Sequence, residues 1–339
     1  MSGIADTVVV IVGYNNCEDI LQCLAALSRA ATAPRFDVFI CENGGRAAYE
    51  RLVESLIDAE LCRASVKVDS APPFVAAQRM ALRGRSTTLL IGCANDNLGY
   101  AGGVNAWLRP LMRQEGWKGV WILNPDAEPA PDALGALVAR AETGGKSMVG
   151  STILENGDGE RVRFRGGLQW RRLSARSVAI GLGERLDAPI DLAAIEQAME
   201  SPSGASMYVT RRCIEQIGLM DDSYFLFFED LDWGARAKKL GLGYAPTSVV
   251  AHKRGTTTGS AGRSAALSRL AVYLQHRNAI HFARRHHPWS VPARIALSAL
   301  FALRFLLHRA PGASAATLAG LAAGLRGETG APAWSRSRS

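Results

Sequence analysis

Three absences narrow the class of protein that this sequence can encode. The first apolar run, Val8 to Val12, is short and lacks a basic lead and a cleavage site, so we expect no signal peptide. No segment reaches about 18 uninterrupted apolar residues, which predicts that no helix spans a membrane. Disorder is not expected, because 48% of the 339 residues are hydrophobic and 21% are charged. This length suffices for one large or two ordinary domains with an ample core.

Cysteine is too sparse and too scattered to build a framework. There are six cysteines, none in a CxxC pair, and most lie inside apolar runs: Cys17, Cys23, Cys41, Cys62, Cys93 and Cys213. This pattern argues against a disulfide scaffold and against a cysteine zinc site. We expect small buried hydrophobic side chains and a reducing, cytoplasmic location.

Acidic residues are nearly missing from the last quarter of the chain. Residues 261–339 contain eleven arginines, no lysine and one acidic residue, Glu328, whereas the remainder holds 28 basic and 30 acidic residues. The net charge of +8 therefore belongs to the C-terminal region.

The first 150 residues repeat a unit of strand, loop and helix. Short apolar runs at 7–12, 36–41, 87–93 and 119–123 are each followed by a helical pattern: at 18–27, at 47–56, from within 95–105 through Leu111, and at 131–141. Strands that alternate with helices predict an α/β fold whose mostly parallel sheet is covered on both faces. Ligands collect at the carboxyl ends of such strands, where this chain carries Asn15, Glu42, Asn97 and Asp126.

The later elements are less regular. We expect an irregular excursion over 60–86, a hairpin over 161–180 and a loop with a short helix over 181–200. The remaining predictions are a strand at 204–209, a helical turn at 211–217, a strand at 244–251 that ends at His252, and helices from Ser264 onward that are broken at Pro288 and Pro311.

One stretch concentrates negative charge beside apolar residues, and we call residues 221–236 the acidic segment. Glu229, Asp230 and Asp232 follow an aromatic run from Tyr224 to Phe228. Repulsion and desolvation at the edge of a core raise the pKa of a carboxylate, which suits a general base. The alternative is that the three acids occupy the first turn of a helix ending near Gly241, where they complement the helix dipole.

Two further stretches have both a structural and a functional interpretation. Asn124-Pro125-Asp126 follows a buried strand, so Asp126 is either a turn and capping residue or a ligand for a hard divalent cation, with His252 as a second ligand. The glycines of 97–105 serve either a tight turn or the approach of phosphate to a helix N-terminus. The stretch lacks the Walker and GxGxxG patterns.

Five motifs in order resemble the family 2 inverting glycosyltransferases, and most of all their rhamnosyltransferase-like branch. The resemblance spans about residues 7–255 and rests on Val8-Val9-Val10-Ile11-Val12-Gly13-Tyr14-Asn15, Glu42-Asn43-Gly44, Asn97-Leu98-Gly99-Tyr100-Ala101-Gly102-Gly103-Val104-Asn105, Asn124-Pro125-Asp126 and Phe228-Glu229-Asp230-Leu231-Asp232. It implies a GT-A fold, a Rossmann-like and mostly parallel sheet flanked by helices, here with a helical C-terminal region.

The resemblance also implies roles for individual residues. Donor binding falls to Tyr14, Asn15, Glu42, Asn97, Gly102, Gly103, Asn105 and Asn124, with Tyr14 and Glu42 near the nucleobase and ribose. Asp126, with His252, would hold a manganese or magnesium ion. Asp230 would be the catalytic base, with Glu229 and Asp232 in support. Gly13 and Glu42 depart from the family, which often has asparagine or threonine at the first position and usually aspartate at the second. Asn124 replaces a second acid, which leaves the metal fewer protein ligands and suggests weak metal affinity.

We expect a catalytic domain over 1–260, with a nucleotide-sugar half (1–150) and an acceptor half (151–260), then a basic amphipathic helical region (261–330) and a disordered tail (331–339). Two interpretations stay open for the C-terminal helices. They pack on the catalytic domain or on a second subunit in a homodimer, or residues 264–310 contact an anionic membrane peripherally at its cytoplasmic face.

The resemblance favours transfer of rhamnose from dTDP-rhamnose, or else of a sugar from a UDP-sugar, to a saccharide or lipid-linked acceptor in bacterial polysaccharide, O-antigen or cell-wall assembly. One alternative is a sugar nucleotidyltransferase, but the basic glycine-rich loop of that class is missing after the first strand. A second alternative is a non-catalytic nucleic-acid-binding protein that uses the basic tail. No aromatic stacking platform supports it, and we expect no nucleic-acid partner.

Overall fold

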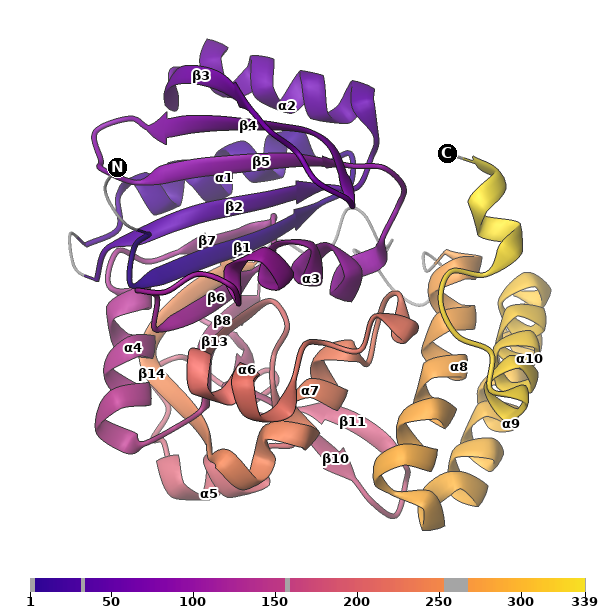
Figure 1. Cartoon of the computed structure of the whole chain (residues 1–339). Coiled ribbons are helices and arrows are strands. Elements are labelled where there is room, and N and C mark those ends of the chain that lie inside the picture. Colours follow the sequence, from indigo (N-terminus) through magenta and orange to yellow (C-terminus); the bar gives the residue numbers. More distant parts are fainter. Residues whose placement is uncertain (1–3, 32–33, 156–158, 253–267, 339) are drawn as a thin grey trace.

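The structure is a computed structural model that describes residues 4–31, 34–155, 159–252 and 268–338. Within these ranges, eleven strands form the main sheet: β1 (Thr7–Gly13), β2 (Phe36–Glu42), β3 (Cys62–Val68), β4 (Phe74–Leu82), β5 (Thr88–Ala94), β6 (Gly119–Leu123), β7 (Ala127–Pro129), β8 (Met148–Glu155), β9 (Val162–Arg165), β13 (Ser206–Thr210) and β14 (Leu242–His252). Their order is β3-β4-β5-β2-β1-β6-β13-β8-β14-β7, with β9 beside β8 (Figure 1). A smaller sheet contains β10 (Gly167–Arg171), β11 (Arg176–Ala179) and β12 (Ser201–Pro202).

The centre of the main sheet is parallel, as the sequence predicts. β1 pairs in parallel with both β2 and β6, and β2 pairs in parallel with β5. Antiparallel pairs extend the sheet on either side, with β4 against β5 and β13 against β6. The carboxyl ends of the parallel strands therefore meet at one edge.

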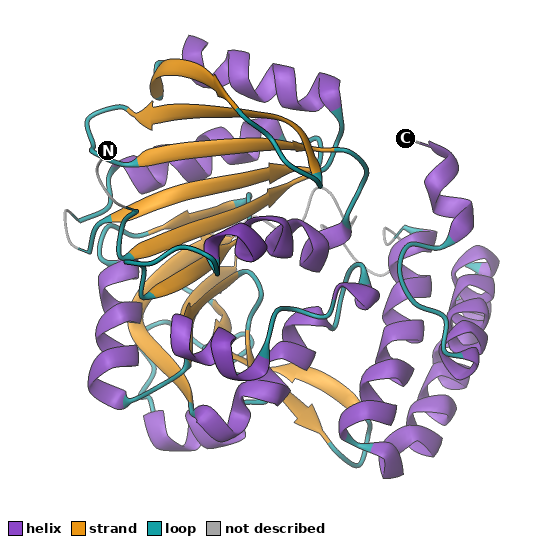
Figure 2. Cartoon of the chain, in the orientation of Figure 1, coloured by secondary structure: helices purple, strands orange, loops and turns teal. Residues whose placement is uncertain are grey.

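Helices cover both faces of this sheet (Figure 2). The α-helices of the described residues are α1 (Cys17–Ser28), α2 (Arg46–Asp58), α3 (Gly99–Leu111), α4 (Ala133–Gly144), α5 (Leu192–Ala198), α6 (Arg211–Ile217), α7 (Glu229–Ala237), α8 (Arg269–His286), α9 (Val291–Leu307) and α10 (Pro311–Arg326). α1, α2 and α4 share one apolar cluster with the sheet, and α3, α6 and α7 share the other.

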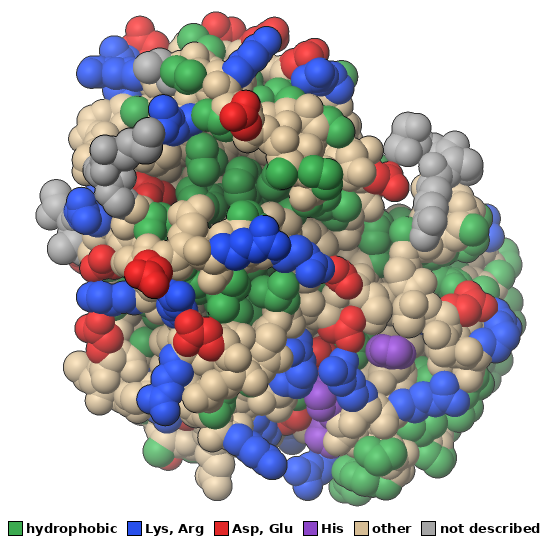
Figure 3. Space-filling view, viewed as in Figure 1, with side chains coloured by type: hydrophobic (Ala, Val, Ile, Leu, Met, Phe, Trp, Pro, Cys, Tyr) green, Lys and Arg blue, Asp and Glu red, His purple; other side chains and the backbone are tan. Residues whose placement is uncertain are grey.

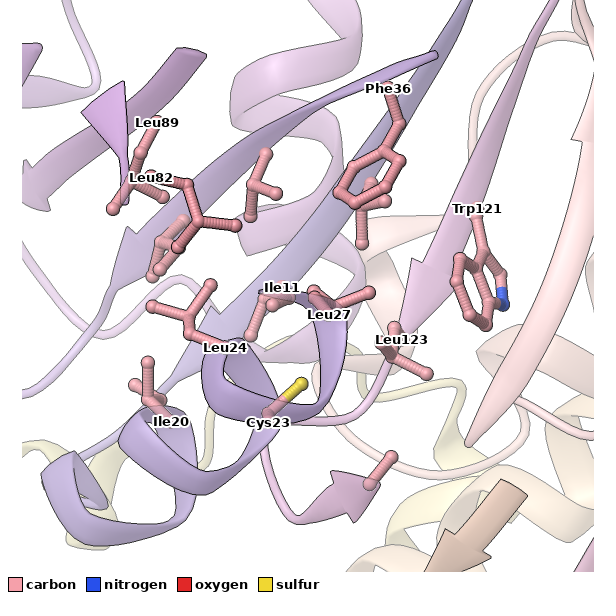
Figure 4. Packing of buried hydrophobic residues seen from close by; sticks show 14 of the residues in the cluster. Ile11, Ile20, Cys23, Leu24, Leu27, Phe36, Leu82, Leu89, Trp121 and Leu123 are labelled. Carbon is pink, nitrogen blue, oxygen red and sulfur yellow. The ribbon is translucent and has the colours of Figure 1, made fainter. Parts of the chain in front are cut away.

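Successive side chains of β1 point to opposite faces of the sheet and so enter different clusters. Val9 and Ile11 enter the cluster beneath α1, whereas Val8 and Val10 enter the opposite one. Figure 4 shows how α1 packs against the sheet in the first cluster, through Ile20, Cys23, Leu24 and Leu27. Each such buried aliphatic side chain contributes about 1.5–3 kcal/mol. All six cysteines are free thiols and five of them are buried, which confirms their packing role.

The expectation of an irregular excursion over 60–86 is wrong. β3 and β4 form an antiparallel hairpin at the edge of the main sheet. In β4 the side chains of Ala77, Met80 and Leu82 are buried, while Arg79 is exposed. The alternation is hard to see in the sequence because the register between β4 and β5 shifts between Phe74 and Ala76, and such a bulge breaks the period of two.

The three C-terminal helices lie side by side, to one side of the main sheet (Figure 1). α8 is the inner helix: Phe282 and Ala283 share an apolar cluster with Tyr224 and Leu231 of the acidic segment. Packing on the catalytic part, one of the two interpretations above, is therefore observed for α8. Residues 264–267 of the proposed membrane region lie outside the described residues.

Two further features describe this region. In the structure Ala333–Arg338 forms a 3-10 helix, and the rings of Trp334 and Tyr273 meet edge to face with their centroids 5.6 Å apart, while the predicted disorder of 331–339 stays a prediction. Not all arginines of the C-terminal helices are exposed, because Arg277 and Arg294 are buried.

The stretch Pro288–Leu307 differs from the expectation that no helix could span a membrane. By length and composition it is apolar enough to do so, with a mean hydropathy of 1.6 and 22% of its residues buried. Core helices of water-soluble proteins pass the same test, so one such helix is a weak indication. The interruption by Arg304 hides this property from a search for uninterrupted apolar residues.

Candidate active site

A cavity of about 1040 Å³ lies where the parallel strands end. The loops after β1, β5 and β6, the last residue of β14 and the acidic segment all line it. The predicted site residues that reach the cavity are Tyr14, Asn97, Gly102, Asn124, Asp126, Glu229, Asp230 and His252. Those that do not line it are Asn15, Glu42, Gly103, Asn105 and Asp232.

Glu42 does not line the cavity but binds the backbone of two loops next to it. Its side chain is buried, and Oε1 accepts hydrogen bonds from the backbone N–H groups of Asn15, at 3.1 Å, and Gly44, at 2.7 Å. Burial raises the pKa of this carboxyl, and the two backbone bonds oppose that rise. A Cβ atom on Gly13 would lie 2.7 Å from Glu42 Oε2. The two departures from the family pattern therefore compensate, since glycine makes room for the longer carboxylate.

Gly103 and Asn105 have packing roles. A Cβ atom on Gly103 would lie 2.7 Å from a methyl group of Val12, so this glycine lets α3 approach β1. Asn105 is buried, and its Nδ2 donates to the carbonyl of Met220 at 2.8 Å. Neither residue lines the cavity where the resemblance placed a nucleotide.

The start of α3 is already occupied by protein groups. The N–H of Gly99 donates to Asn97 Oδ1 at 3.0 Å, and the N–H of Tyr100 donates to the carbonyl of Phe225 at 2.8 Å. These two donors are used within the protein, and the approach of a phosphate to this helix N-terminus stays a prediction. Gly99 has φ 72°, and a Cβ atom there would lie 2.2 Å from the Phe225 carbonyl oxygen. Glycine is needed here because α3 and the acidic segment touch through their backbones.

Asp126 and His252 converge at the cavity. His252 Nε2 lies 3.2 Å from Asp126 Oδ1 and 3.1 Å from Asn124 Nδ2, and both Asp126 and His252 are buried. His252 Nδ1 is also buried and has no hydrogen-bond partner within the part of the chain that the structure describes. Among the described residues, no group of three or more histidine, cysteine, aspartate or glutamate side chains could hold a metal. The donors present fit an ion such as Mg²⁺, which takes few protein ligands and completes its shell with water and phosphate.

Asp230 is held at the cavity by three backbone contacts. Oδ2 accepts from the N–H of Gly204 at 3.0 Å, and Oδ1 accepts from the N–H of Leu231 at 2.8 Å. The main-chain carbonyl of Asp230 accepts from Ser201 Oγ at 2.7 Å. Burial raises the pKa of the Asp230 carboxyl, while the two N–H donors favour its ionised form.

Glu229 occupies a different environment, although it is the next residue. Its side chain is 5% exposed, and Oε2 has no hydrogen-bond partner among the described residues. Burial, and secondarily the charge of Asp230, raise the pKa of Glu229 to about 8. Burial thus favours the neutral form of Glu229, whereas the two N–H donors at Asp230 favour the charged form of that neighbour.

Asp232, predicted to support the base, is bound by side chains of α7 and α8. Its carboxylate is fully buried and receives Arg236 Nε at 2.8 Å, His286 Nε2 at 2.7 Å and Arg285 Nη1 at 3.3 Å. Burial opposes ionisation, but the hydrogen bond from His286 and the charges of Arg236 and Arg285 outweigh it and lower the pKa of Asp232. This acid ties α7 to α8.

Several contributors to the site are not recognisable in the sequence alone. Gly204 supplies a backbone N–H, and Tyr100 Oη donates to the Gly204 carbonyl at 2.7 Å. Asn43 lines the cavity and donates to the carbonyl of Gly99 at 3.0 Å. Only the motif position of Asn43, next to Glu42, could have indicated it. The C-terminal region also reaches the cavity, through Ser268, Leu270, Ala271, Gly330, Ala331 and Ser335.

Comparison with known proteins agrees with this architecture. The sequence model of the family described as glycosyltransferase like family 2 matches residues 5–279. The chain is similar to the N-acetylglucosaminyl-diphospho-decaprenol L-rhamnosyltransferase of Mycobacterium tuberculosis, with 28% identity over 233 residues, which cover 61% of this chain and 71% of that protein. It is also similar to the low-salt glycan biosynthesis hexosyltransferase Agl10 of Haloferax volcanii, with 25% identity over 160 residues, 46% of this chain and 48% of that protein.

A solved structure with a similar fold is the mannosyltransferase PcManGT of Pyrobaculum calidifontis in complex with GDP-Man and Mn²⁺. The TM-score is 0.50 at 14% sequence identity, over 96% of this chain and 88% of that one. At this identity the likeness concerns the fold, and it confirms the predicted GT-A architecture.

The compensation between Gly13 and Glu42 can be tested by a double-mutant cycle. Gly13→Ala should lower the free energy of unfolding by about 1–3 kcal/mol, because the new methyl group overpacks the Glu42 carboxylate. Added to Glu42→Asp, the same change should cost less, since the shorter carboxylate leaves room. Gly312→Ala is the control, because a Cβ atom there meets nothing within 4 Å. Additive effects of the two changes, measured by chemical denaturation, would contradict the compensation.

Proposed function

The chain belongs to the family described as glycosyltransferase like family 2, and we propose that it is an inverting, metal-dependent enzyme that transfers a sugar from a nucleoside diphosphate to an acceptor hydroxyl group. One observation carries this proposal: a pair of cation ligands, Asp126 and His252, and a candidate base, Asp230, line the same cavity at the carboxyl edge of the sheet.

The donor would lie along the loops that follow β1, β5 and β6. Tyr14 is 38% exposed at the mouth of the cavity, where its ring can cover a nucleobase, and Asn97 lies in the wall. The diphosphate would lie near Asp126, since two of the N–H groups at the start of α3 are used within the protein. dTDP-rhamnose is the first candidate donor, because the mycobacterial relative is named as a rhamnosyltransferase; a UDP-sugar is the second.

Asp126 and His252 are the residues that would hold a divalent metal, Mn²⁺ or Mg²⁺. When bound, such an ion stabilises the negative charge on the departing nucleoside diphosphate. Two protein ligands leave most of the coordination shell to water and to the donor, so we propose that the metal binds weakly without donor.

Asp230 would act as the base in a single displacement. Its ionised carboxylate takes the proton of the acceptor hydroxyl group while that oxygen forms a bond to the anomeric carbon of the donor. The bond from the anomeric carbon to the diphosphate oxygen breaks on the opposite face, so the configuration inverts. The N–H groups of Gly204 and Leu231 hold the carboxylate in place during this step. The raised pKa of Glu229 disfavours a second negative charge beside it.

The acceptor side of the cavity is largely apolar. Phe225, Leu226 and Phe227 of the acidic segment face it together with Leu270 and Ala331 of the C-terminal region. A polar sugar alone would not require such a wall, whereas the lipid part of a lipid-linked saccharide would contact it. We therefore propose an acceptor of that class, as in the name of the mycobacterial relative, and a role in bacterial cell-wall or polysaccharide assembly.

α9 offers a surface on which the enzyme could meet a membrane that holds such an acceptor. Leu300, Leu303 and Leu307 are 61%, 53% and 75% exposed, and their spacing places them on one face of the helix. Arg304 and Arg309 are also exposed there. In Figure 3, hydrophobic side chains gather at the edge of the molecule over α9 and α10. Because α9 packs lengthwise against α8 and α10, we propose that it lies on an anionic cytoplasmic membrane surface and does not cross it.

The roles of Asp230 and Glu229 can be separated by matched amide variants. Asp230→Asn should keep donor binding and lower kcat by about 10²–10⁴-fold, because no group remains to accept the proton. Glu229→Gln should keep most of the activity at pH 7, since glutamine resembles a protonated glutamate. In the wild-type enzyme, activity should fall as pH decreases through the raised pKa of Asp230, above the usual range of an aspartate. Near-normal turnover of Asp230→Asn would move the base to Glu229.

Donor binding should depend on the metal. We expect calorimetric titration with dTDP-rhamnose, UDP-sugars and GDP-sugars to show tight binding of one nucleotide class with Mn²⁺ and weak binding with EDTA. Asp126→Asn should remove the difference, whereas Asp132→Asn, at an exposed neighbouring carboxylate, should not. Full affinity in EDTA would exclude the proposed role of Asp126. If no nucleotide binds under either condition, the proposed function is wrong.

The membrane proposal predicts that the full chain floats with vesicles containing anionic lipid and floats less with neutral vesicles. The triple variant Leu300→Gln, Leu303→Gln and Leu307→Gln should stay unbound because its apolar face is lost. Ile57→Gln is the control, since Ile57 is 48% exposed on α2. Equal flotation of the wild type and the triple variant would refute the proposal. Loss of a dimer in the triple variant, without any flotation of the wild type, would assign the face to a second copy.

A further inference from the structure

The backbone directly before Asp230 has an unusual conformation. Three of four consecutive residues, Phe225, Phe227 and Phe228, have φ of 65°, 69° and 74°. At Phe225, ψ is −57° and the N–H of Leu226 donates to the carbonyl of Tyr224 at 2.8 Å, which makes a γ-turn of the rare, strained kind. Residues other than glycine cost on the order of 1–3 kcal/mol each in such conformations, so surrounding contacts must hold them. We call residues 224–228 the aromatic turn.

The aromatic turn sets the start of α7. Phe228 is the N-cap residue, with φ 74° and ψ −9°, and Glu229 and Asp230 are the first two residues of the helix. The direction of the Asp230 side chain therefore depends on the path of the turn. A shift of the turn would also move Asp230 relative to the N–H of Gly204, which belongs to a different part of the chain.

One side-chain amide of α8 binds most of the turn. Asn278 Nδ2 lies 2.9 Å from the carbonyl oxygen of Tyr224, 2.8 Å from that of Leu226 and 2.9 Å from that of Phe227. Asn278 is 1% exposed, so water does not replace these bonds. Without this amide the carbonyl groups of Leu226 and Phe227 would lose the donor that Asn278 supplies, which costs about 1–3 kcal/mol for each unsatisfied buried group.

Arg277 fixes the orientation of that amide. Its Nε donates to Asn278 Oδ1 at 2.8 Å, which leaves Nδ2 directed at the turn, and its Nη2 donates to the carbonyl of Tyr224 at 3.0 Å. Nη1 donates to the carbonyl of Gly330 at 2.6 Å, and the N–H of Gly330 donates to the carbonyl of Ser223 at 2.6 Å. The guanidinium thus joins α8, the aromatic turn and the segment that follows α10.

On the opposite side, the start of α3 supplies the N–H of Tyr100 to the carbonyl of Phe225. In Figure 1 the segment that leads into α7 lies between α3 and α8. The carbonyl groups of Tyr224, Phe225, Leu226 and Phe227 are each bound from one helix or the other. The turn is therefore held between α3, on one side, and α8, on the other.

We propose that Asn278, oriented by Arg277, is a positioning residue for transfer: it holds the aromatic turn in its strained conformation and thereby aims Asp230. This proposal rests on the proposed function of Asp230. It makes the C-terminal helix α8 a part of the catalytic apparatus, in addition to its packing role. Neither residue was a candidate in the sequence, since an arginine and an asparagine within a basic helix carry no pattern of their own.

The test compares Asn278→Ala with His276→Ala. His276 lies on the same helix and is also buried, but it bonds to Ser298 Oγ at 2.9 Å and Arg294 Nη2 at 3.1 Å, away from the turn. At a temperature where both variants are folded, Asn278→Ala should lower kcat by about 10²-fold, the effect of a misplacement of about 1 Å, with the Kd for donor unchanged. His276→Ala should keep kcat close to that of the wild type.

The pH profile separates positioning from loss of stability. Displaced from the N–H groups of Gly204 and Leu231, Asp230 loses bonds that favour its ionised form, so the acidic limb of kcat should move to higher pH in Asn278→Ala. Arg277→Lys, a milder change, should show a smaller shift of the same sign and serves if Asn278→Ala does not fold. An unchanged kcat and acidic limb in the two turn variants, or an equal loss in His276→Ala, would overturn the proposal.

Amide hydrogen exchange gives a readout that needs no substrate. Residues 221–236 should exchange faster in Asn278→Ala and Arg277→Lys than in the wild type, and not in His276→Ala. Unchanged exchange would also overturn the proposal. If Asp230→Asn is fully active while the exchange result is as expected, the base assignment fails and the support of the turn by α8 stands. If Asp230→Asn is inactive and Asn278→Ala is normal, the positioning role fails alone.

Discussion

The close approach of α3 to the acidic segment is the constraint on which the site depends. At Gly99 the two backbones are so near that any side chain would collide with the carbonyl of Phe225, and the N–H of Tyr100 binds that carbonyl. This contact joins the loops at the ends of the parallel strands to the helix that carries Asp230. The hydroxyl group of Tyr100 adds a second link, to the carbonyl of Gly204, whose N–H holds the Asp230 carboxylate. One residue of α3 thus fixes both sides of the proposed base.

The electrostatic design follows from the same packing. Three acids that look alike in the sequence have three environments: Asp230 receives two N–H donors, Glu229 has an unpaired oxygen in an apolar setting, and Asp232 is surrounded by Arg236, His286 and Arg285. Burial acts on all of them. The local donors distinguish the three carboxylates: Asp230 is the proposed base, Glu229 is a neighbour with a raised pKa, and Asp232 links α7 to α8.

The sequence predicted correctly those parts of the fold that depend on patterns between neighbouring residues. Apolar runs followed by helical periodicity gave the parallel centre of the sheet, and polar residues at strand ends gave the loops that meet at the cavity. Long-range contacts were beyond its reach. The β3–β4 hairpin was hidden by a bulge at Phe74, and the buried position of Glu42 follows only from the space left by Gly13. The role of α8 was hidden by its charge: a basic helix suggests an exposed face, but Arg277 is buried because it finds backbone carbonyls.

The two hydrogen bonds of Gly330, to Arg277 and to Ser223, affect when the site can be completed during synthesis of the chain. The cavity wall includes residues from Tyr14 to Ser335, and Gly330 joins Arg277 to Ser223. The central parallel strands β5, β2, β1 and β6 all precede residue 124 and pair with one another. The contacts of Gly330 with Arg277 and Ser223 can form only after residue 330 has been added to the chain. The support that α8 gives to the proposed base is therefore complete only in a chain that includes the segment after α10.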